Sequence, residues 1–282
     1  MSSGQRITDY DRVAGRFDTR YRQYSYDGVR ETLINFLGVE RSAVLEVGSG
    51  TGHWLAVCAA RLRPLPYETR IEASHDDASL GSPKASAERG VLAGIEPSVA
   101  MLERARAAAP DAHLVRARAE ELPWRDASFD RIFCVNALHH FTDRARFFAE
   151  ARRVLKPGGG LLTIGKDPHT ERDDWWVYQY FEETRAIDRD RFARVRTLRG
   201  EMALAGFAWT ESMEAEHIEV VQPASEALAN GVVHPSFTSQ LTVLSDEEFQ
   251  RGADRLRRAN DEAGGQLQLV ADFRLYATIG WM

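Results

Sequence analysis

The residues best suited to chemistry form a glycine-rich run near residue 50. A short apolar stretch, Val44 to Val47, carries an acid at Glu46 and leads into Gly48-Ser49-Gly50-Thr51-Gly52. Glycine permits backbone angles that other residues resist, and it lets the main chain approach a ligand closely. A helix that follows such a turn points free N–H groups and a partial positive charge at that ligand. The run therefore predicts a nucleotide-like ligand at the carboxyl end of a strand.

The spacing of the glycines distinguishes between ligands. A dinucleotide-binding turn has the form Gly-x-Gly-x-x-Gly, whereas this turn reads Gly-x-Gly-x-Gly after an acid. The sequence also lacks a Tyr-x-x-x-Lys pair. Both observations disfavour the alternative of an NAD-dependent dehydrogenase.

Helical and strand patterns alternate from Val29 to Gly165. The patterns predict helices over Val29–Leu37, Trp54–Leu62, Ser98–Ala109 and Arg144–Leu155, and strands over Val44–Val47, Val91–Ile95, His113–Arg116, Arg131–Val135 and Gly160–Gly165. Beyond them we expect helices over Asp173–Phe192, Leu198–Leu204 and Ser245–Ala263, and strands over Thr210–Val221 and Leu267–Ile279. This alternation predicts an α/β fold with a Rossmann-like open sheet, mostly parallel with an antiparallel last strand, and helices on both faces.

We expect a single domain in which the sheet carries several added segments. Residues 1–28 form an N-terminal lid, and residues 29–167 form the cofactor-binding core with a surface insertion at 63–88. Residues 168–196 and 223–263 are inserted helical substrate caps, whereas 197–222 and 264–282 complete the sheet.

Four segments in this order resemble the class I S-adenosylmethionine-dependent methyltransferases, in particular the ubiquinone and menaquinone biosynthesis type. They are Glu46–Gly52, Gly94–Leu102, Ala119–Trp124 with Ser128–Asp130, and Asn136–Phe141 with Leu155–Gly160. The resemblance implies S-adenosylmethionine as the cofactor and a small molecule as the methyl acceptor. The residues that it implies for cofactor binding are Tyr21, Glu46, Gly48, Ser49, Gly50, Thr51, Gly52, Glu96, Pro97, Met101, Ala119, Glu120 and Asn136.

Two departures from the family pattern affect single residues. The family acid that holds the ribose hydroxyls corresponds to Glu96, fifty residues after Glu46, and the insertion at 63–88 accounts for the distance; Glu72 is a rival acid. Arg118 stands where the family usually has the Asp that lies near the adenine amino group, so either Glu120 makes that contact or the contact is lost.

His139 and His140 follow the fourth predicted strand, on the edge where the acceptor should bind. Histidine is the natural general base near neutral pH for an acceptor that must lose a proton. The alternative is that one ring packs in the core or caps a helix while the other is solvated. We predict no metal site, because no pair of histidines has ligand spacing together with a third ligand.

Aromatic side chains flank the predicted site on both sides. The resemblance implies that an N-terminal segment, here Tyr10-Asp11-Arg12-Val13-Ala14, folds over the cofactor; the alternative is a helix that packs on the core. A second aromatic group, Trp175, Trp176, Tyr178 and Tyr180, stands where the family builds substrate caps. An apolar or aromatic acceptor is therefore expected.

Composition sets limits on partners and location. The net charge of −6 over 282 residues disfavours a nucleic-acid partner. Cys58 and Cys134 lie in apolar stretches and read as core thiols, and no signal peptide or membrane span is visible, so we expect a soluble, cytoplasmic protein. A non-catalytic cofactor-binding or interaction module, or a methyltransferase acting on a macromolecule, are the alternative functions. The oligomeric state is not predicted.

Overall fold

The computed structural model describes residues 10–38, 42–62 and 91–282. The predicted insertion at 63–88, with the rival acid Glu72, lies outside the described residues.

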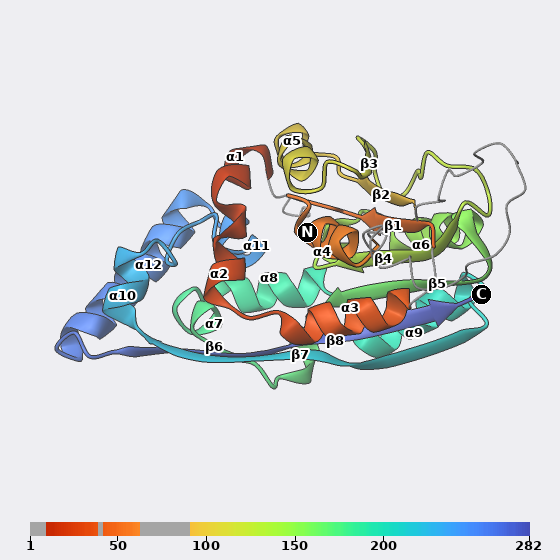
Figure 1. Ribbon diagram of the computed structural model, residues 1–282. Helices are drawn as coiled ribbons and strands as arrows, with labels where there is room; N and C mark the ends of the chain where they lie inside the picture. Colours follow the sequence, from red (N-terminus) through yellow and green to blue (C-terminus); the bar gives the residue numbers. More distant parts are fainter. Residues whose placement is uncertain (1–9, 39–41, 63–90) are drawn as a thin grey trace, which may run out of the picture.

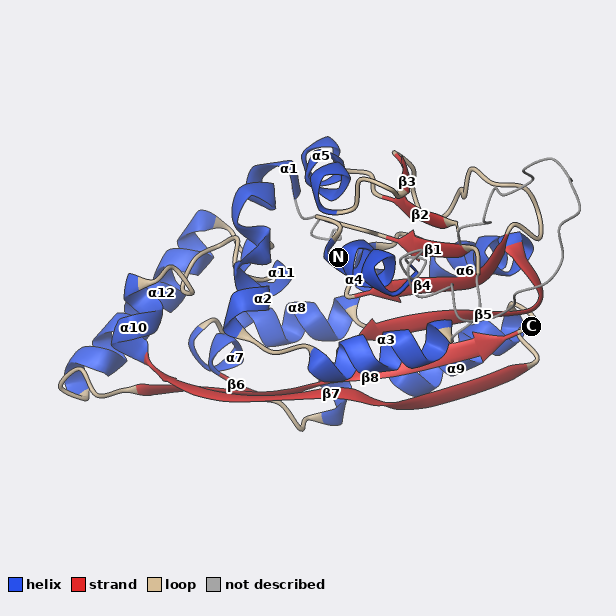
Figure 2. Cartoon of the chain, in the orientation of Figure 1, coloured by secondary structure: helices blue, strands red, loops and turns tan. Residues whose placement is uncertain are grey.

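The strands of the described chain form one sheet in the order β3-β2-β1-β4-β5-β8-β6, with β7 also paired to β8 (Figure 1, Figure 2). The parallel strands are β1 (Val44–Val47), β2 (Leu92–Ile95), β3 (His113–Val115), β4 (Phe129–Val135) and β5 (Leu155–Gly165). The antiparallel part consists of β8 (Gln268–Trp281), which pairs with β5, β6 (Asp174–Trp175) and β7 (Trp209–Pro223). The predicted mostly parallel sheet with an antiparallel last strand is confirmed.

Helices cover both faces of the sheet because successive side chains of a strand point to opposite faces. On β1, Val44 belongs to a core cluster shared with Leu33 of α3 (Asp27–Leu37) and Leu55 of α4 (His53–Leu62). Leu45 belongs to a second cluster, shared with Phe147 of α6 (Arg144–Val154); α9 (Val195–Leu204) lies on the same face. Helix α5 (Val99–Ala108) packs beside α4. The predicted two-sided arrangement is confirmed.

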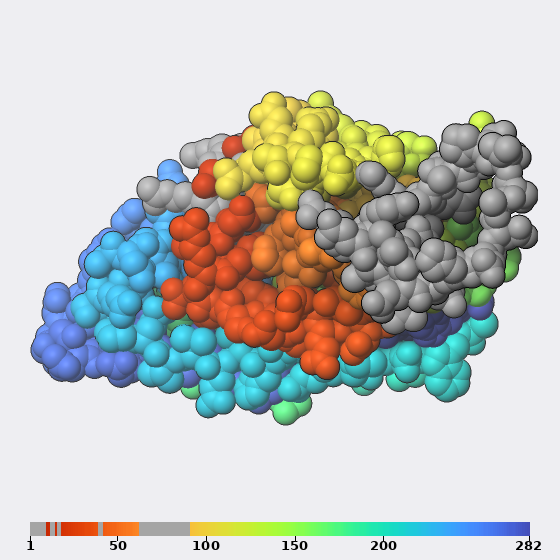
Figure 3. Space-filling view, in the orientation of Figure 1, coloured from red at the N-terminus to blue at the C-terminus, as the bar shows by residue number. Residues whose placement is uncertain are grey.

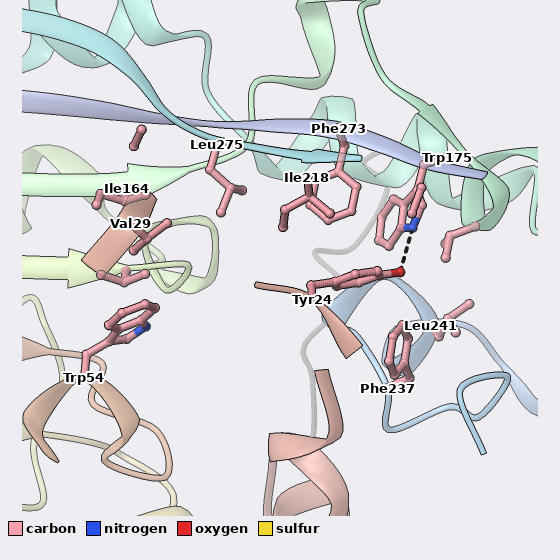
Figure 4. Packing of buried hydrophobic residues seen from close by; sticks show 14 of the residues in the cluster. Tyr24, Val29, Trp54, Ile164, Trp175, Ile218, Phe237, Leu241, Phe273 and Leu275 are labelled. Atoms are coloured by element: carbon pink, nitrogen blue, oxygen red, sulfur yellow. Dashed lines mark hydrogen bonds between the residues drawn. The ribbon is translucent and has the colours of Figure 1, made fainter. Parts of the chain in front are cut away.

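The β7–β8 pair extends well beyond the parallel strands and carries a helical cap at its far end (Figure 1). The segment that connects these two strands in the sequence forms α10 (Ala224–Ala229), α11 (Ser239–Thr242) and α12 (Asp246–Glu262). The helix predicted from Ser245 begins with a capping box: the Ser245 hydroxyl accepts from the Glu248 backbone N–H, and the Glu248 carboxylate accepts from the Ser245 N–H. The aromatic side chains of Tyr24, Trp175 and Phe237 pack together inside this cap (Figure 4).

One predicted helix is wrong. Instead of a single helix over Asp173–Phe192, the chain forms β6, α7 (Trp176–Tyr180) and α8 (Glu183–Arg191). Asp174 and Trp175 are drawn into the sheet as an edge strand on β8. The helical conformation is then interrupted between α7 and α8, where the Thr184 hydroxyl donates to the carbonyl of Phe181.

The N-terminal residues cross the opening between the sheet and the cap. They form α1 (Tyr10–Val13), the 3-10 helix η1 (Ala14–Thr19) and α2 (Arg20–Gln23). In the space-filling view this segment (red) lies between the α5 region (yellow) and the cap (blue) (Figure 3).

Candidate active site

A cavity of about 580 Å³ lies at the carboxyl ends of the parallel strands. Its lining includes both candidate bases, His139 and His140, and nearly all the residues that the resemblance implies for cofactor binding: Tyr21, Glu46, Gly48, Ser49, Gly50, Thr51, Glu96, Pro97, Met101, Ala119, Glu120 and Asn136. Gly52 is the exception. An added Cβ there would lie 2.8 Å from the Cα of Ala105, so the glycine allows α4 and α5 to pack closely.

The glycine turn has the backbone geometry that the sequence indicated. Gly48 and Gly50 have φ angles of 78° and 51°, in the left-handed region that favours glycine. A Cβ on Gly48 would lie 2.5 Å from the Cβ of Ala137. Asn136, at the end of β4, also has a positive φ of 51°. The two turns therefore meet at the cavity without room for a larger residue at position 48.

Glu96 connects the glycine turn to helix α5. One carboxylate oxygen accepts from the backbone N–H of Gly50 and the other from that of Ser98, both at 3.0 Å. The side chain is buried, and burial raises its pKa although the two hydrogen bonds act in the opposite direction. A carboxylate oxygen can accept more than one hydrogen bond. Glu96 can therefore bind two vicinal hydroxyls while it holds both backbone groups.

Glu46 is the most buried acid of the cavity, with a residue exposure of 1%. Its Oε2 atom has no hydrogen-bond partner among the described residues. Burial, and then the charge of Glu96, raise the pKa of Glu46 well above its usual value. A buried acceptor without a partner is costly. A ligand that brings an ammonium group to this position would remove that cost, so the amino group of S-adenosylmethionine fits the residues present.

The remaining cofactor residues surround the other end of the cavity. Met101 is fully buried. The Ser98 hydroxyl caps α5 by accepting from the backbone N–H of Met101, as expected for the start of that helix. One oxygen of Glu120 accepts from both the backbone N–H and the hydroxyl of Thr142 at 2.8 Å. Glu120 thus holds the segment after β4 in place while it lines the cavity, and Arg118 lines the cavity nearby.

The N-terminal segment contacts the cavity at several points. The ring of Tyr21 stacks on His53 with centroids 3.7 Å apart. The Asp18 carboxylate accepts from the Thr51 hydroxyl at 2.5 Å, and the hydroxyl of Tyr10 bonds Nε2 of His140. These contacts join residues 10–23 to the glycine turn and to the end of β4.

Both candidate histidines lie in the 3-10 helix η3 (Leu138–His140) and face the cavity. His139 is buried, stacks on Phe192 at 4.0 Å and has Nε2 3.2 Å from the Ser239 hydroxyl. His140 is half-buried. Burial lowers the pKa of His139 well below its usual value and that of His140 to about 3. Both rings are therefore neutral at pH 7.

Two smaller cavities, of about 40 and 30 Å³, each share His139 with the lining of the main one. The 40 Å³ cavity also shares Arg20 and Asn136 with it. Both small cavities are lined by Lys166, and the 30 Å³ cavity by Arg191 as well. Sequence reasoning missed these cations because they follow no motif and belong to an arginine-rich chain.

Two further findings concern the described residues alone. They contain no group of three His, Cys, Asp or Glu side chains that could hold a metal ion. Their helices are all too short or too polar to cross a membrane.

Comparison with known proteins gives consistent matches. Residues 78–163 match a family model described as a methyltransferase domain. The chain is 29% identical over 181 residues to a demethylmenaquinone methyltransferase of Thermotoga maritima, covering 62% of this chain and 68% of the relative. It is 30% identical over 161 residues to the ubiquinone/menaquinone biosynthesis C-methyltransferase UbiE of Acidiphilium cryptum, covering 55% of this chain and 56% of that relative.

Solved structures share the fold. The YcgJ protein of Bacillus subtilis superposes with a TM-score of 0.58 at 16% identity, covering 91% of this chain and 98% of that protein. A putative methyltransferase from an antibiotic biosynthesis pathway of Anabaena variabilis gives the same TM-score at 18% identity, covering 89% and 95%.

Proposed function

Because the chain belongs to the class I S-adenosylmethionine-dependent methyltransferases, we propose that it transfers a methyl group from S-adenosylmethionine to a small-molecule acceptor. The observation that carries this proposal is the pair of buried acids in one cavity. Glu46 has an oxygen without a partner, and Glu96 bridges the glycine turn and α5. In the proposal Glu46 faces the amino group of the donor, and Glu96 accepts from its ribose hydroxyls.

The sulfonium of the donor supplies an already electrophilic methyl group, so the protein must orient the two reactants and exclude water. The N-terminal segment, residues 1–28, acts as the lid in this proposal. The bonds from Asp18 to Thr51 and from Tyr10 to His140 support that role, since they lie across the cavity. The segments 168–196 and 223–263 act as the substrate caps.

We infer that the acceptor enters beside the histidines and is apolar or aromatic. The 40 Å³ cavity shares Arg20, Asn136 and His139 with the main one, and its aromatic lining includes Tyr24, Trp175, Phe192 and Phe273. Both imidazoles are neutral and can accept a proton, and their lowered pKa values make them weak bases; His139 or His140 would serve as the base for an acceptor that must lose one. Cys58 and Cys134 are both buried and unpaired, which supports action in the cytoplasm.

Calorimetry with S-adenosylmethionine and S-adenosylhomocysteine on folded protein tests the cofactor assignment. We expect binding of both, and failure to bind either one would refute the proposal. Transfer of labelled methyl groups to a panel of phenols, quinols and carboxylic acids then tests the reaction. Cofactor binding without transfer to any acceptor would favour a non-catalytic module, and transfer to protein or RNA would favour a macromolecular acceptor.

The histidines need a separate measurement once an acceptor is known. His139→Ala and His140→Ala should each lower kcat if that residue is the base. Turnover close to that of the unmodified protein in both variants would show that neither is required.

A further inference from the structure

The two small cavities differ from the main one in the charge of their lining. The main cavity is lined by the acids Asp11, Glu46, Glu96 and Glu120 as well as by Arg20, Arg116 and Arg118. The 30 Å³ cavity is lined by Arg144, Lys166 and Arg191 and by no carboxylate of the described chain. The 40 Å³ cavity, likewise without a described carboxylate, is lined by Arg20 and Lys166. The charged side chains that line the space behind His139 are therefore cations. Three of them are paired with carboxylates that lie outside the lining: Arg144 with Glu201, Lys166 with Asp173 and Arg191 with Asp188.

Arg191, the last residue of α8, lines the 30 Å³ cavity and has donors without a partner. Its side chain is 5% exposed, and its Nη2 donates to the buried Asp188 at 2.7 Å. Its Nε and Nη1 are buried and have no hydrogen-bond partner among the described residues. The Asp188 carboxylate is already shared, because it also accepts from Tyr178 and Gln240. Arg191 can therefore bind a second acceptor without releasing the first.

Lys166, which directly follows β5, is also paired with a carboxylate, as Arg191 is. Its ammonium lies 3.0 Å from Asp173 and within 4.1 to 4.8 Å of the centroids of three aromatic rings, those of Trp175, Tyr178 and Phe273. Burial lowers its pKa, whereas the charges of Asp173 and then Asp188 oppose the shift. Asp173 does not line either small cavity. Asp173 and Asp188 thus pair with Lys166 and Arg191 from outside the lining of the two small cavities.

A third polar group faces the same space without a partner. The hydroxyl of Tyr276 on β8 is buried and unpartnered among the described residues, and Tyr276 belongs to the lining of the 30 Å³ cavity. Leaving such buried donors unsatisfied destabilises the folded protein. A cavity of this volume holds about two water molecules, and therefore also a group the size of a carboxylate.

We propose that the acceptor carries a carboxylate, which binds in the 30 Å³ cavity between Arg191, Lys166 and the Tyr276 hydroxyl. The remainder of the acceptor lies past His139 and toward the main cavity. This inference rests on the proposed function, because it concerns the same acceptor. It adds the chemical class of that acceptor: an organic acid with an apolar or aromatic body.

Matched pairs of acids and amides test the proposal even before the acceptor itself is identified. The pairs are 4-hydroxybenzoate with 4-hydroxybenzamide, phenylacetate with phenylacetamide, and octanoate with octanamide. Each compound is titrated calorimetrically into protein saturated with S-adenosylhomocysteine. We expect at least one acid to bind about tenfold more tightly than its amide, because hydrogen bonds between charged groups are the stronger ones.

Variants identify the site. Tyr276→Phe removes only an unpartnered hydroxyl, so it should fold normally and still weaken acid binding about fivefold while leaving amide binding unchanged. Arg191→Lys keeps the charge but not the planar fork, and should weaken acid binding at least as much. Arg189→Lys is the matched control, because this residue lies on the same helix in an exposed ion pair with Glu171. It should bind acids like the unmodified protein.

Several results would overturn the inference. Acids that bind no better than their amides, or do not bind, would contradict it, as would an advantage that persists unchanged in both Tyr276→Phe and Arg191→Lys. Acetate or inorganic phosphate that binds as tightly as the organic acids would show a site for free anions instead. Binding of S-adenosylhomocysteine is measured in the same experiments, so failure of the cofactor assignment is seen separately.

Discussion

Replacing Glu96 with glutamine tests the cofactor geometry most directly. The carboxylate accepts from two backbone N–H groups, those of Gly50 and Ser98. A glutamine amide has one oxygen, so its NH₂ group would face one of these donors and leave it unsatisfied at a cost of about 1–3 kcal/mol. It would also lose its charge-assisted bond to one ribose hydroxyl, about 1.5–3 kcal/mol. Part of this cost falls on the folded protein itself, so we expect S-adenosylhomocysteine to bind about 10- to 100-fold more weakly.

The assay is isothermal titration with S-adenosylhomocysteine, together with urea unfolding of each protein. Glu103→Gln is the matched control, because Glu103 is an exposed acid on helix α5, which begins shortly after Glu96. It should leave both affinity and stability unchanged. If Glu96→Gln binds within threefold of the unmodified protein, Glu96 does not contact the ribose and the assignment of the second strand is wrong.

Other changes give smaller or more specific effects. Because the pKa of Glu46 is raised in the folded protein, the ligand-free protein loses stability as pH rises through that pKa. Glu46→Gln should therefore raise Tm more at pH 8 than at pH 4.5, and it should weaken cofactor binding. A Tm difference independent of pH would contradict this. Gly48→Ala should lower the free energy of unfolding, measured by urea titration, by about 2–4 kcal/mol, because Gly48 has a positive φ and lies close to Ala137. Gly158 is the control: its φ is 75° and no atom lies within 4 Å, so Gly158→Ala should cost only about 1–2 kcal/mol. Equal losses in the two variants would refute the contact with Ala137. The pKa of about 3 keeps His140 neutral, so it should contribute no change in kcat between pH 5 and 8; a step near pH 6.5 that disappears in His140→Ala would contradict this.

The sequence predicted the parallel half of the fold well because its signals are local. The strand at Val44–Val47 coincides with the structure, and the glycine turn after it has the positive φ angles that its composition requires. Ser98 begins α5 and Ser245 begins α12 because a hydroxyl that accepts from the first turn is a property of a few neighbouring residues. Glu96, the acid that follows β2, was identified in the same way from its neighbours in the sequence.

The cap was predicted less well because its structure depends on distant partners. The residues from Asp173 to Phe192 have helical composition, yet Trp175 joins the sheet because the extended β8 offers it a free edge. The hydrogen bond between His139 and Ser239 joins residues a hundred positions apart. Arg191 is one of several closely spaced arginines that composition alone cannot rank, and only the fold separates it from the exposed Arg189.

The division of charge within the site gives the two reactants different places. The acids Glu46 and Glu96 line the large cavity, where a donor with an ammonium group and ribose hydroxyls would satisfy them. The cations Lys166 and Arg191 line the small cavity, where a donor amino group would be repelled and a carboxylate attracted. His139 lies on both linings, and its neutral ring adds no charge to either side. An acceptor anchored by its acid in the small cavity would therefore present its other end at His139, toward the donor.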